Sequence, residues 1–134
     1  MPSNEENIAM MHRLVFEIQQ DADYSLIPTL VAPNFINHTA EAGLPNDISG
    51  VAMVMQYIHA AFSDIKMQID SCICDSDLIA TNKVLTGKHV GEFMGVKGKG
   101  EKKRVRIMDF VKVNEAGKIV EHWACIRPAE LLGE

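Results

Sequence analysis

The sequence predicts a single α+β domain, in which helices come first and a curved antiparallel sheet follows. Apolar residues recur at helical spacing over much of residues 1–62, and from Ile65 onward they alternate with polar residues, as in half-buried strands. Helices and strands that are segregated in this way are typical of a sheet packed on one side by helices. The chain has 134 residues, and domains commonly have about 100–150 residues, so we expect one domain spanning residues 1–134.

The first helix is predicted to begin near the N-terminal end of the chain. Ser3 and Glu6 match the S-x-x-E capping box, in which the two side chains bond free backbone N–H groups at the start of a helix. The apolar stripe that follows has the spacing of one helix face and consists of Ile8, Met11, Leu14, Val15 and Ile18. We therefore expect this face to pack against the sheet.

Two more helices are predicted before the strands. A short one is expected within residues 23–31, and residues 34–38 form a short extended segment after it. Gly, Pro, Asn and Asp residues make 41–49 a loop. The third helix is expected over residues 50–62, where apolar residues return to helical spacing. Its Met53 and Met55 are expected mostly to fill the core, and they would also suit the wall of an adaptable pocket, since methionine side chains fill irregular spaces.

Four strands with alternating apolar and polar residues are predicted after the helices. They span residues 65–73, 78–90, 104–113 and 118–127. Turns at 75–77 and 114–117 connect the first pair and the last pair as hairpins. The basic segment 95–103 looks like a phosphate-binding loop, but it lacks the G-K-[ST] ending and leads into a strand. A solvated hairpin tip is therefore the better interpretation.

The composition argues against several classes of function. The net charge of −5 argues against nucleic acid or an anionic membrane as a partner. The longest apolar run, residues 51–55, is far shorter than the roughly 20 residues of a membrane-spanning helix. The N-terminal residues are polar and acidic, unlike a secretory signal, so we expect a cytoplasmic protein. The three cysteines, Cys72, Cys74 and Cys125, are too few for a disulfide framework and form no zinc-binding pattern.

Asp109 is the strongest candidate for a reactive group. It lies in the middle of a strand face that is otherwise apolar, together with Val105, Ile107, Val111 and Val113. A carboxylate on a buried face is costly unless it is paired, hydrogen-bonded or protonated, and burial tends to raise its pKa toward the range of a general base. The alternatives are that this strand lies at an edge of the sheet, or that Asp109 binds a buried donor for a structural reason.

Histidines are the second group of candidates. His38 ends a short extended segment, and His89 lies near the end of the second predicted strand. His122 precedes Trp123, the only tryptophan. A single histidine is more often a hydrogen-bonded structural group than a catalyst. No spacing in the sequence matches a metal-binding cluster of histidines and carboxylates, so we expect no metal.

An ordered set of short motifs resembles a known family. The motifs are FINH at 35–38, AFSD at 61–64, TGKHVGEFMG at 86–95, MDFVKV at 108–113 and GKIVEHW at 117–123. Together they resemble the SnoaL-like polyketide cyclases, within the nuclear-transport-factor-2-like (ketosteroid isomerase-like) superfamily. The resemblance implies a cone-shaped α+β barrel that encloses a pocket, and a homodimer. It also implies an enzyme without cofactor or metal, which closes a ring by intramolecular aldol condensation.

The resemblance assigns roles to single residues. Asp109 falls where the family's catalytic aspartate is expected, and His38 and His89 fall on the family's pocket histidines. The expected ligand is a small apolar or aromatic carbonyl compound, and the residues expected to bind it are Trp123, Phe35, Tyr57, Phe93 and Arg127. The sequence departs from the family at residues 39–40, which are Thr-Ala where relatives have Asn-Pro, and at Arg127, where relatives more often have aspartate.

Three functions remain open from the sequence. The first is an enzyme in which Asp109 removes a proton alpha to a carbonyl, and His89 or His38 stabilises the enolate. The second is a non-catalytic protein that binds an apolar metabolite in the same pocket. The third is an interaction module whose open sheet face forms a homodimer. The implied fold serves isomerases, dehydratases, hydrolases and binding proteins, so it does not decide among them.

Overall fold

The computed structural model describes residues 1–127 of the chain. The helices are α1 (Asn4–Arg13), η1 (Leu14–Gln20), η2 (Tyr24–Leu26), α2 (Ile27–Leu30) and α3 (Ser49–Ala61). The strands are β1 (Val31–Asn37), β2 (Phe62–Asp75), β3 (Leu78–His89), β4 (Glu92–Phe93), β5 (Val96–Lys97), β6 (Glu101–Val113) and β7 (Ile119–Arg127). The predicted α+β class is confirmed. Within this described part, none of the helices is both long and apolar enough to span a membrane.

Five strands form one curved, mixed sheet in the order β1-β7-β6-β3-β2. The strands β2, β3, β6 and β7 pair antiparallel with one another, as predicted, but β1 pairs parallel with β7. The extended segment predicted at 34–38 is thus the end of a fifth strand. Since β1 and β2 lie at opposite edges and do not pair, the sheet is not closed. The expected cone is therefore an open one and not a complete barrel.

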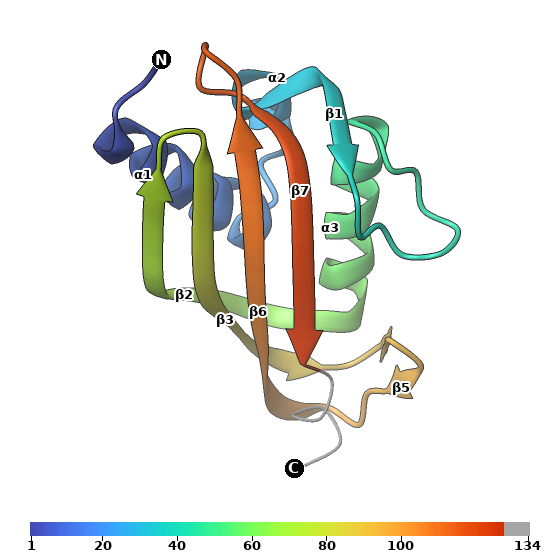
Figure 1. Ribbon diagram of the computed structural model, residues 1–134. Helices are drawn as coiled ribbons and strands as arrows, with labels where there is room; N and C mark the ends of the chain where they lie inside the picture. Colours follow the sequence, from blue (N-terminus) through green and yellow to red (C-terminus); the bar gives the residue numbers. More distant parts are fainter. Residues whose placement is uncertain (128–134) are drawn as a thin grey trace.

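The helices lie on one side of this sheet (Figure 1). α1 and η1 pack against β2, and α3 leads directly into the same strand. Buried residues of α1 and η1, such as Met11, Val15 and Ile18, belong to one core cluster with the inner face of the sheet. The apolar stripe predicted for the first helix is confirmed over this stretch.

The first helix differs from the prediction in its second half. The capping box is present, since the Glu6 backbone N–H donates to Ser3 Oγ (3.1 Å) and the Ser3 N–H donates to Glu6 Oε1 (3.2 Å). Over Leu14–Gln20, however, the helix widens into a π-helix, and at its end the Asp21 N–H donates to the Phe16 carbonyl five residues earlier (3.2 Å). Apolar spacing alone does not reveal this change, because residues four apart lie on nearly the same face of either helix.

β2 begins three residues earlier than predicted. Phe62, the first residue after α3, already has extended backbone angles (φ −127°, ψ 139°), so no loop separates the helix from the strand. Asp64 has a positive φ of 54°, and the pairing with β3 shifts between Ser63 and Lys66. This irregularity interrupts the alternation of apolar and polar residues. The sequence pattern therefore becomes regular only at Ile65.

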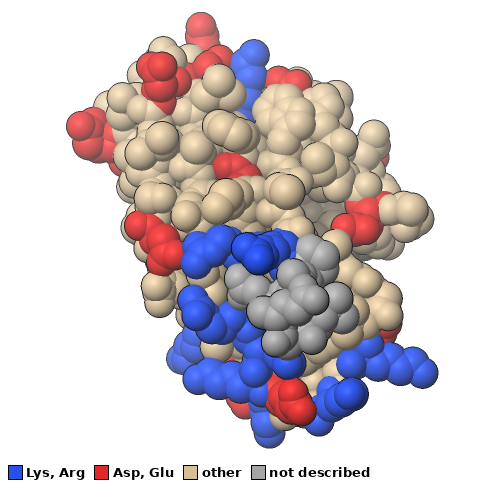
Figure 2. Space-filling view, turned by 60° about the horizontal axis from the view of Figure 1, so that its bottom comes forward, with Lys and Arg blue, Asp and Glu red and all other residues tan. Residues whose placement is uncertain are grey.

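The basic segment near residue 100 contains short strands. β4 and β5 form a small hairpin, and β6 begins at Glu101, so the loop expected over 95–103 is shorter than predicted. Exposed or half-buried basic side chains gather at this end of the molecule (Figure 2), namely Lys88, Lys97, Lys99, Lys102, Lys103 and Arg104. Although the net charge is −5, the charged side chains are unevenly distributed, and one end of the molecule is basic.

Candidate active site

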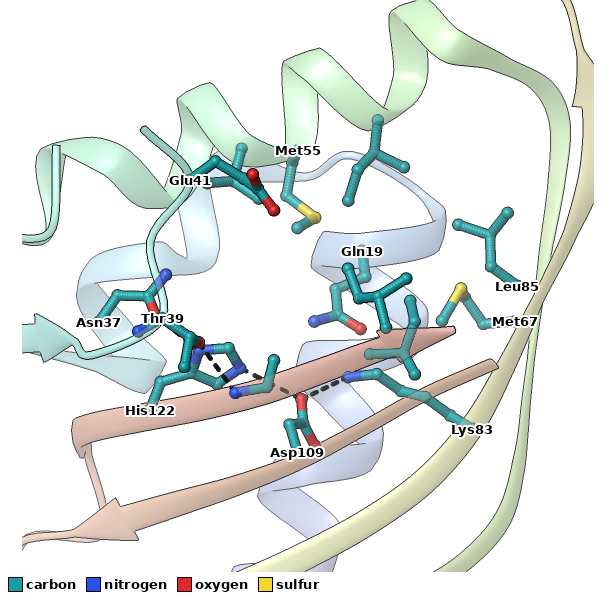
Figure 3. A pocket seen from close by; sticks show the side chains of 15 residues that line it. Gln19, Asn37, Thr39, Glu41, Met55, Met67, Lys83, Leu85, Asp109 and His122 are labelled. Carbon is teal, nitrogen blue, oxygen red and sulfur yellow. Dashed lines mark hydrogen bonds and ion pairs between the residues drawn. The ribbon is translucent and has the colours of Figure 1, made fainter. Parts of the chain in front are cut away.

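A cavity of about 100 Å³ lies between α3 and the inner face of the sheet (Figure 3). Most of its wall is apolar and consists of Val54, Met55, Ile58, Met67, Leu85, Ile107, Ala124 and Ile126. The polar residues that line it are Gln19, Asn37, Thr39, Glu41, Lys83, Asp109 and His122. An adjoining lobe of about 70 Å³ shares Gln19, Asn37, Val54, Met55 and His122. An apolar chamber with a few polar groups is the usual form of a small-molecule site.

Asp109 lies on the inner face of β6, as the strand pattern predicted. Alternate residues of this strand are buried from Val105 to Val113, and Asp109 itself is 4% exposed. β6 lies between β7 and β3, so the alternative of an edge strand is excluded. The carboxylate is therefore inside the fold and lines the cavity.

Two donors meet one oxygen of Asp109 (Figure 3). Lys83 of β3 donates from Nζ to Oδ2 (2.7 Å), and both side chains are only 1% exposed. His122 of β7 has its Nε2 atom 3.3 Å from the same oxygen. The second oxygen, Oδ1, is buried and has no hydrogen-bond partner within residues 1–127. One oxygen of the carboxylate is thus held by two donors, while the other keeps its lone pairs free.

These partners reverse the expected direction of the Asp109 pKa. Burial alone raises the pKa of this carboxyl, as the sequence suggested. The Lys83 ammonium and the hydrogen bonds from His122 and Lys83 outweigh burial, so the pKa lies below its ordinary value. The expectation of a raised pKa is therefore wrong, because it did not include the buried cation. Asp109 is ionised at neutral pH.

His122 contacts an oxygen atom at each ring nitrogen. Nδ1 lies 3.1 Å from Oδ1 of Asn37, and the same oxygen accepts the backbone N–H of Thr39 (3.1 Å), which orients the amide oxygen toward the ring. Nε2 lies 3.3 Å from Oδ2 of Asp109. The ring thus links Asn37 to the carboxylate, and Lys83 is the buried positive group beside it.

The described residues do not form a metal site. Within residues 1–127, no group of three or more His, Cys, Asp and Glu side chains is arranged to hold a metal ion. The positive charge beside Asp109 comes from the Lys83 ammonium.

Comparison with known proteins agrees with this fold. The sequence profile of the SnoaL-like polyketide cyclases matches residues 9–133. The chain belongs to the SnoaL-like polyketide cyclase family. The resemblance drawn from the short motifs is thereby confirmed. No curated protein matches this SnoaL-like chain.

Solved structures with the same SnoaL-like fold carry different proposed activities. AclR from Streptomyces galilaeus, a proposed hydroxylase, is 25% identical with a TM-score of 0.81, over 98% of this chain and 96% of AclR. IdmH from Streptomyces antibioticus, a proposed polyketide cyclase, is 28% identical with a TM-score of 0.77, over 96% of this chain and 95% of IdmH. A SnoaL-like polyketide cyclase from Agrobacterium tumefaciens is 15% identical with a TM-score of 0.79, over 98% of both chains, which shows the fold alone.

His89 does not lie beside Asp109 in this SnoaL-like protein. Thr81 is the β3 residue opposite Asp109, and His89 lies eight residues farther along the strand, about 25 Å of extended chain. The His89 ring is 2% exposed and stacks on Phe62, with ring centroids 5.0 Å apart. The structure therefore places His89 in an aromatic part of the core, away from Asp109.

His38 and Trp123 lie together, but neither lines the SnoaL-like cavity. Trp123 directly follows His122 on β7, so its side chain points to the opposite face of the sheet, where it lines a groove with Phe110. His38 stacks on Trp123, with ring centroids 4.7 Å apart, and its Nε2 is 2.9 Å from a carboxylate oxygen of Glu121. The structure thus brings the expected histidine and the expected aromatic residue together outside the cavity.

Of the other four residues expected to bind the ligand, one lines the cavity and three do not. Phe35 lines the adjoining lobe of the cavity. Tyr57 and Phe93 line neither lobe, because the Tyr57 hydroxyl accepts the Met94 backbone N–H (2.9 Å) and Phe93 is packed in the core at 3% exposure. Arg127 is exposed at the end of β7. The structure therefore brings only Phe35 of these four residues to the cavity.

The polar side chains of the SnoaL-like cavity that were not anticipated from the sequence include Lys83, Gln19, and His122 as a partner of Asp109. A signal for Lys83 existed, because the other members of its strand face are buried, namely Ile79, Thr81, Leu85 and His89. Gln19 follows Val15 by four residues and so continues the buried stripe of the first helix. In both cases a polar residue occupies a face whose other members are buried.

Proposed function

We propose that this SnoaL-like protein is an enzyme that removes a proton alpha to a carbonyl group of a small, largely apolar substrate, with Asp109 as the general base. The observation that carries the proposal is a buried carboxylate that lines an apolar cavity, keeps one oxygen free, and is flanked by Lys83 and His122. Proton removal is the first step of both aldol cyclisation and isomerisation. We assign the reaction to the cytoplasm, where free thiols such as those of this chain stay reduced.

The proposed step moves one proton and one electron pair. A substrate C–H bond breaks, its proton passes to a carboxylate oxygen of Asp109, and its electron pair forms an enolate whose charge rests on the carbonyl oxygen. The Lys83 ammonium, together with a hydrogen bond from His122, stabilises that oxygen. They take the part expected of His38 and His89. Since these side chains supply both the base and the charge stabilisation, we propose a reaction without a cofactor.

The lowered pKa of Asp109 limits the substrates to those with a comparatively acidic C–H bond. A carboxylate that a buried ammonium and hydrogen bonds from His122 and Lys83 hold in its ionised form is a weak base. Proton transfer is efficient only when the pKa values of the carbon acid and the base are not far apart. The most suitable substrates therefore carry the proton between two carbonyl groups, as in a beta-keto ester. Such an enolate can attack a further carbonyl of the same molecule and close a ring.

Exchange of carbon-bound hydrogen tests the proposal without the natural substrate. Ethyl 2-methylacetoacetate has one acidic C–H between two carbonyls, and its exchange in D₂O is followed by proton NMR. We expect the protein to accelerate this exchange at neutral pH, with a rate that saturates as the ester concentration rises. An exchange rate no higher than that in buffer would contradict the proposal.

A second candidate is a non-catalytic binding protein with the same fold. One observation favours it, namely that Lys83 lies 2.7 Å from Oδ2 of Asp109 in a fully buried pair, as in a structural ion pair. In that case the ester binds to the cavity, as chemical-shift changes would show, while its exchange rate stays at the level of buffer. The same experiment therefore separates the two functions.

We also propose that the outer face of the sheet forms a homodimer. Four apolar residues lie side by side across β2, β3, β6 and β7 in the order Ile73, Ala80, Phe110 and Trp123. Ile73 is 68% exposed and Phe110 is 54% exposed, and a groove of about 340 Å³ follows this face. Soluble monomers rarely leave a large contiguous apolar patch uncovered. A second copy would cover the row with the same apolar surface and bury no charge within it.

Phe110→Lys is expected to convert this dimer into a monomer, because it places a charge within the apolar row. Size-exclusion chromatography with light scattering should give about 14.9 kDa for the variant and twice that mass for the unmodified chain. Met53→Lys is the matched control, since Met53 is also exposed (42%) but lies on α3. A wild-type chain that is monomeric at micromolar concentration would contradict the proposed dimer.

A further inference from the structure

Gln19 brings an unpaired hydrogen-bond acceptor to the cavity. Its Oε1 atom is shielded from solvent and has no hydrogen-bond partner in the described part of the chain. The side chain lines both the main cavity and the adjoining lobe, and Figure 3 shows it in the same space as Lys83 and Asp109. A buried acceptor without a partner is costly, so a donor from a ligand or an ordered water is its usual explanation.

The position of Gln19 is fixed from two sides. Its backbone carbonyl lies 2.8 Å from Nε2 of His59 on α3. The side-chain oxygen of the next residue, Gln20, accepts the backbone N–H of Met67 on β2 (2.8 Å). The end of η1 is thus tied both to the helix and to the sheet that enclose the cavity. The side chain of Gln19 therefore starts from a well-defined backbone.

The π-helix is a second and independent sign of function at this position. Gln19 lies in the last turn of η1, where the Asp21 N–H reaches back to the carbonyl of Phe16. π-helical turns are rare in proteins and are frequent at functional sites. In this chain the unusual turn coincides with the part of the first helix that contributes a polar side chain to the cavity.

The surroundings of Gln19 favour a neutral hydroxyl group as its partner. The charge of Lys83 is already paired with Asp109, and most of the remaining wall is apolar, so a neutral donor is buried there at a lower cost than a charged one. Of the residues that border both lobes together with Gln19, Val54 and Met55 offer no donor, and Asn37 and His122 contact each other. An O–H group of a ligand satisfies the acceptor and adds no charge to the chamber.

We propose that Gln19 is a recognition residue that accepts a hydrogen bond from a hydroxyl group of the substrate, so that the substrate is a hydroxylated carbonyl compound. The carbonyl oxygen is directed toward Lys83 and the hydroxyl toward Gln19, and this pair of contacts sets the orientation of the ligand. The inference rests on the proposed function only for the carbonyl contact, since the hydroxyl contact requires binding alone.

Binding of a matched series of ketones tests the inference. The probes are acetophenone and 2′-, 3′- and 4′-hydroxyacetophenone, and NMR titration gives each Kd. For the wild-type protein we expect at least one hydroxylated isomer to bind about tenfold more tightly than acetophenone, because the unpaired acceptor penalises the ligand without a hydroxyl. Gln19→Met keeps the side-chain length and removes the acceptor. It should reduce this preference to about twofold or less, because acetophenone no longer meets the unpaired acceptor and the hydroxylated isomers lose their hydrogen bond.

Further variants serve as controls for the titrations, and one replaces Gln19→Met if that variant does not fold. Gln19→Glu retains an acceptor and should keep the preference, and Gln68→Met, which removes an exposed glutamine of β2, should change nothing. Gln19→Ala replaces Gln19→Met if the latter does not fold. The inference is overturned if the preference persists without the acceptor, if no isomer binds more tightly than acetophenone, or if none of the four probes binds. Failure of the proposed function is read separately, from hydrogen exchange, because these titrations need no turnover.

Discussion

Lys83→Met is expected to lower the free energy of unfolding by about 3–5 kcal/mol, because it leaves a buried carboxylate without its main partner. Nζ of Lys83 lies 2.7 Å from Oδ2 of Asp109, and both side chains are 1% exposed, so water cannot replace the lost ammonium. His122 is the remaining donor, at 3.3 Å from the same oxygen. Urea denaturation at pH 7, followed by the fluorescence of Trp123, measures the difference.

The expected cause of this loss is the charge and not the volume of the side chain. In the double variant Lys83→Met/Asp109→Asn neither member of the ion pair is left charged, so we expect most of the stability to return. Lys112→Met is the matched control, because the Lys112 side chain is 44% exposed and its Nζ lies 3.9 Å from Asp77, and exposed pairs contribute about 0–1 kcal/mol. A double variant as unstable as Lys83→Met would show that packing is responsible.

The stability lost in Lys83→Met should also depend on pH, and it should become smaller as the pH falls. The folded pKa of Asp109 is lowered, so its ionised form contributes stability above the unfolded value of about 3.9, and this contribution is lost as the pH falls through the folded value. In Lys83→Met, burial is opposed by His122 alone, and we expect the pKa of Asp109 to rise. The difference between the two proteins should be full at neutral pH and should shrink as the pH falls toward and below about 4.

Strand alternation predicted the position of Asp109 but did not predict its partner, Lys83. Asp109 is buried with its apolar neighbours because β6 is a regular interior strand. Lys83 lies on an equally buried face of β3. A lysine on a strand usually extends its long side chain to solvent, so its inward position carries little weight in the sequence alone. The carboxylate is what makes the inward lysine stable, and that contact joins two strands.

Motifs identified the family but not the arrangement of the site. His89 and Asp109 lie on neighbouring strands, yet the register separates them by eight residues, and register is not visible in short motifs. His122 and Trp123 are adjacent in the sequence, and alternation directs only one of them to the cavity. Choosing between them requires knowing which face the helices cover. The same tertiary information is needed to see that Gln19 lies in the last turn of a π-helix beside the cavity.

Asp109→Asn is expected to lower the rate of hydrogen exchange in ethyl 2-methylacetoacetate by a factor of about 10²–10⁴, the usual contribution of a general base. The amide has nearly the shape of the carboxylate but cannot take the proton, so binding of the ester should persist. Circular dichroism checks the fold, because this variant leaves Lys83 buried without its counter-ion, and Lys83→Met/Asp109→Asn is a second protein without the base. Asp75→Asn, at an exposed position of β2, should retain the wild-type rate.

The pH dependence of the exchange rate identifies the base more strictly than its loss does. Because the pKa of Asp109 is lowered, the wild-type rate attributable to the protein should stay constant from neutral pH down to about pH 5. Lys83→Met should move the acid limb to higher pH, since burial then dominates the pKa of the carboxyl. An acid limb that lies above pH 5 in the wild type and does not move in Lys83→Met would assign the base to another group. Asp109 would then be a structural ion-pair partner, as in the binding-protein alternative.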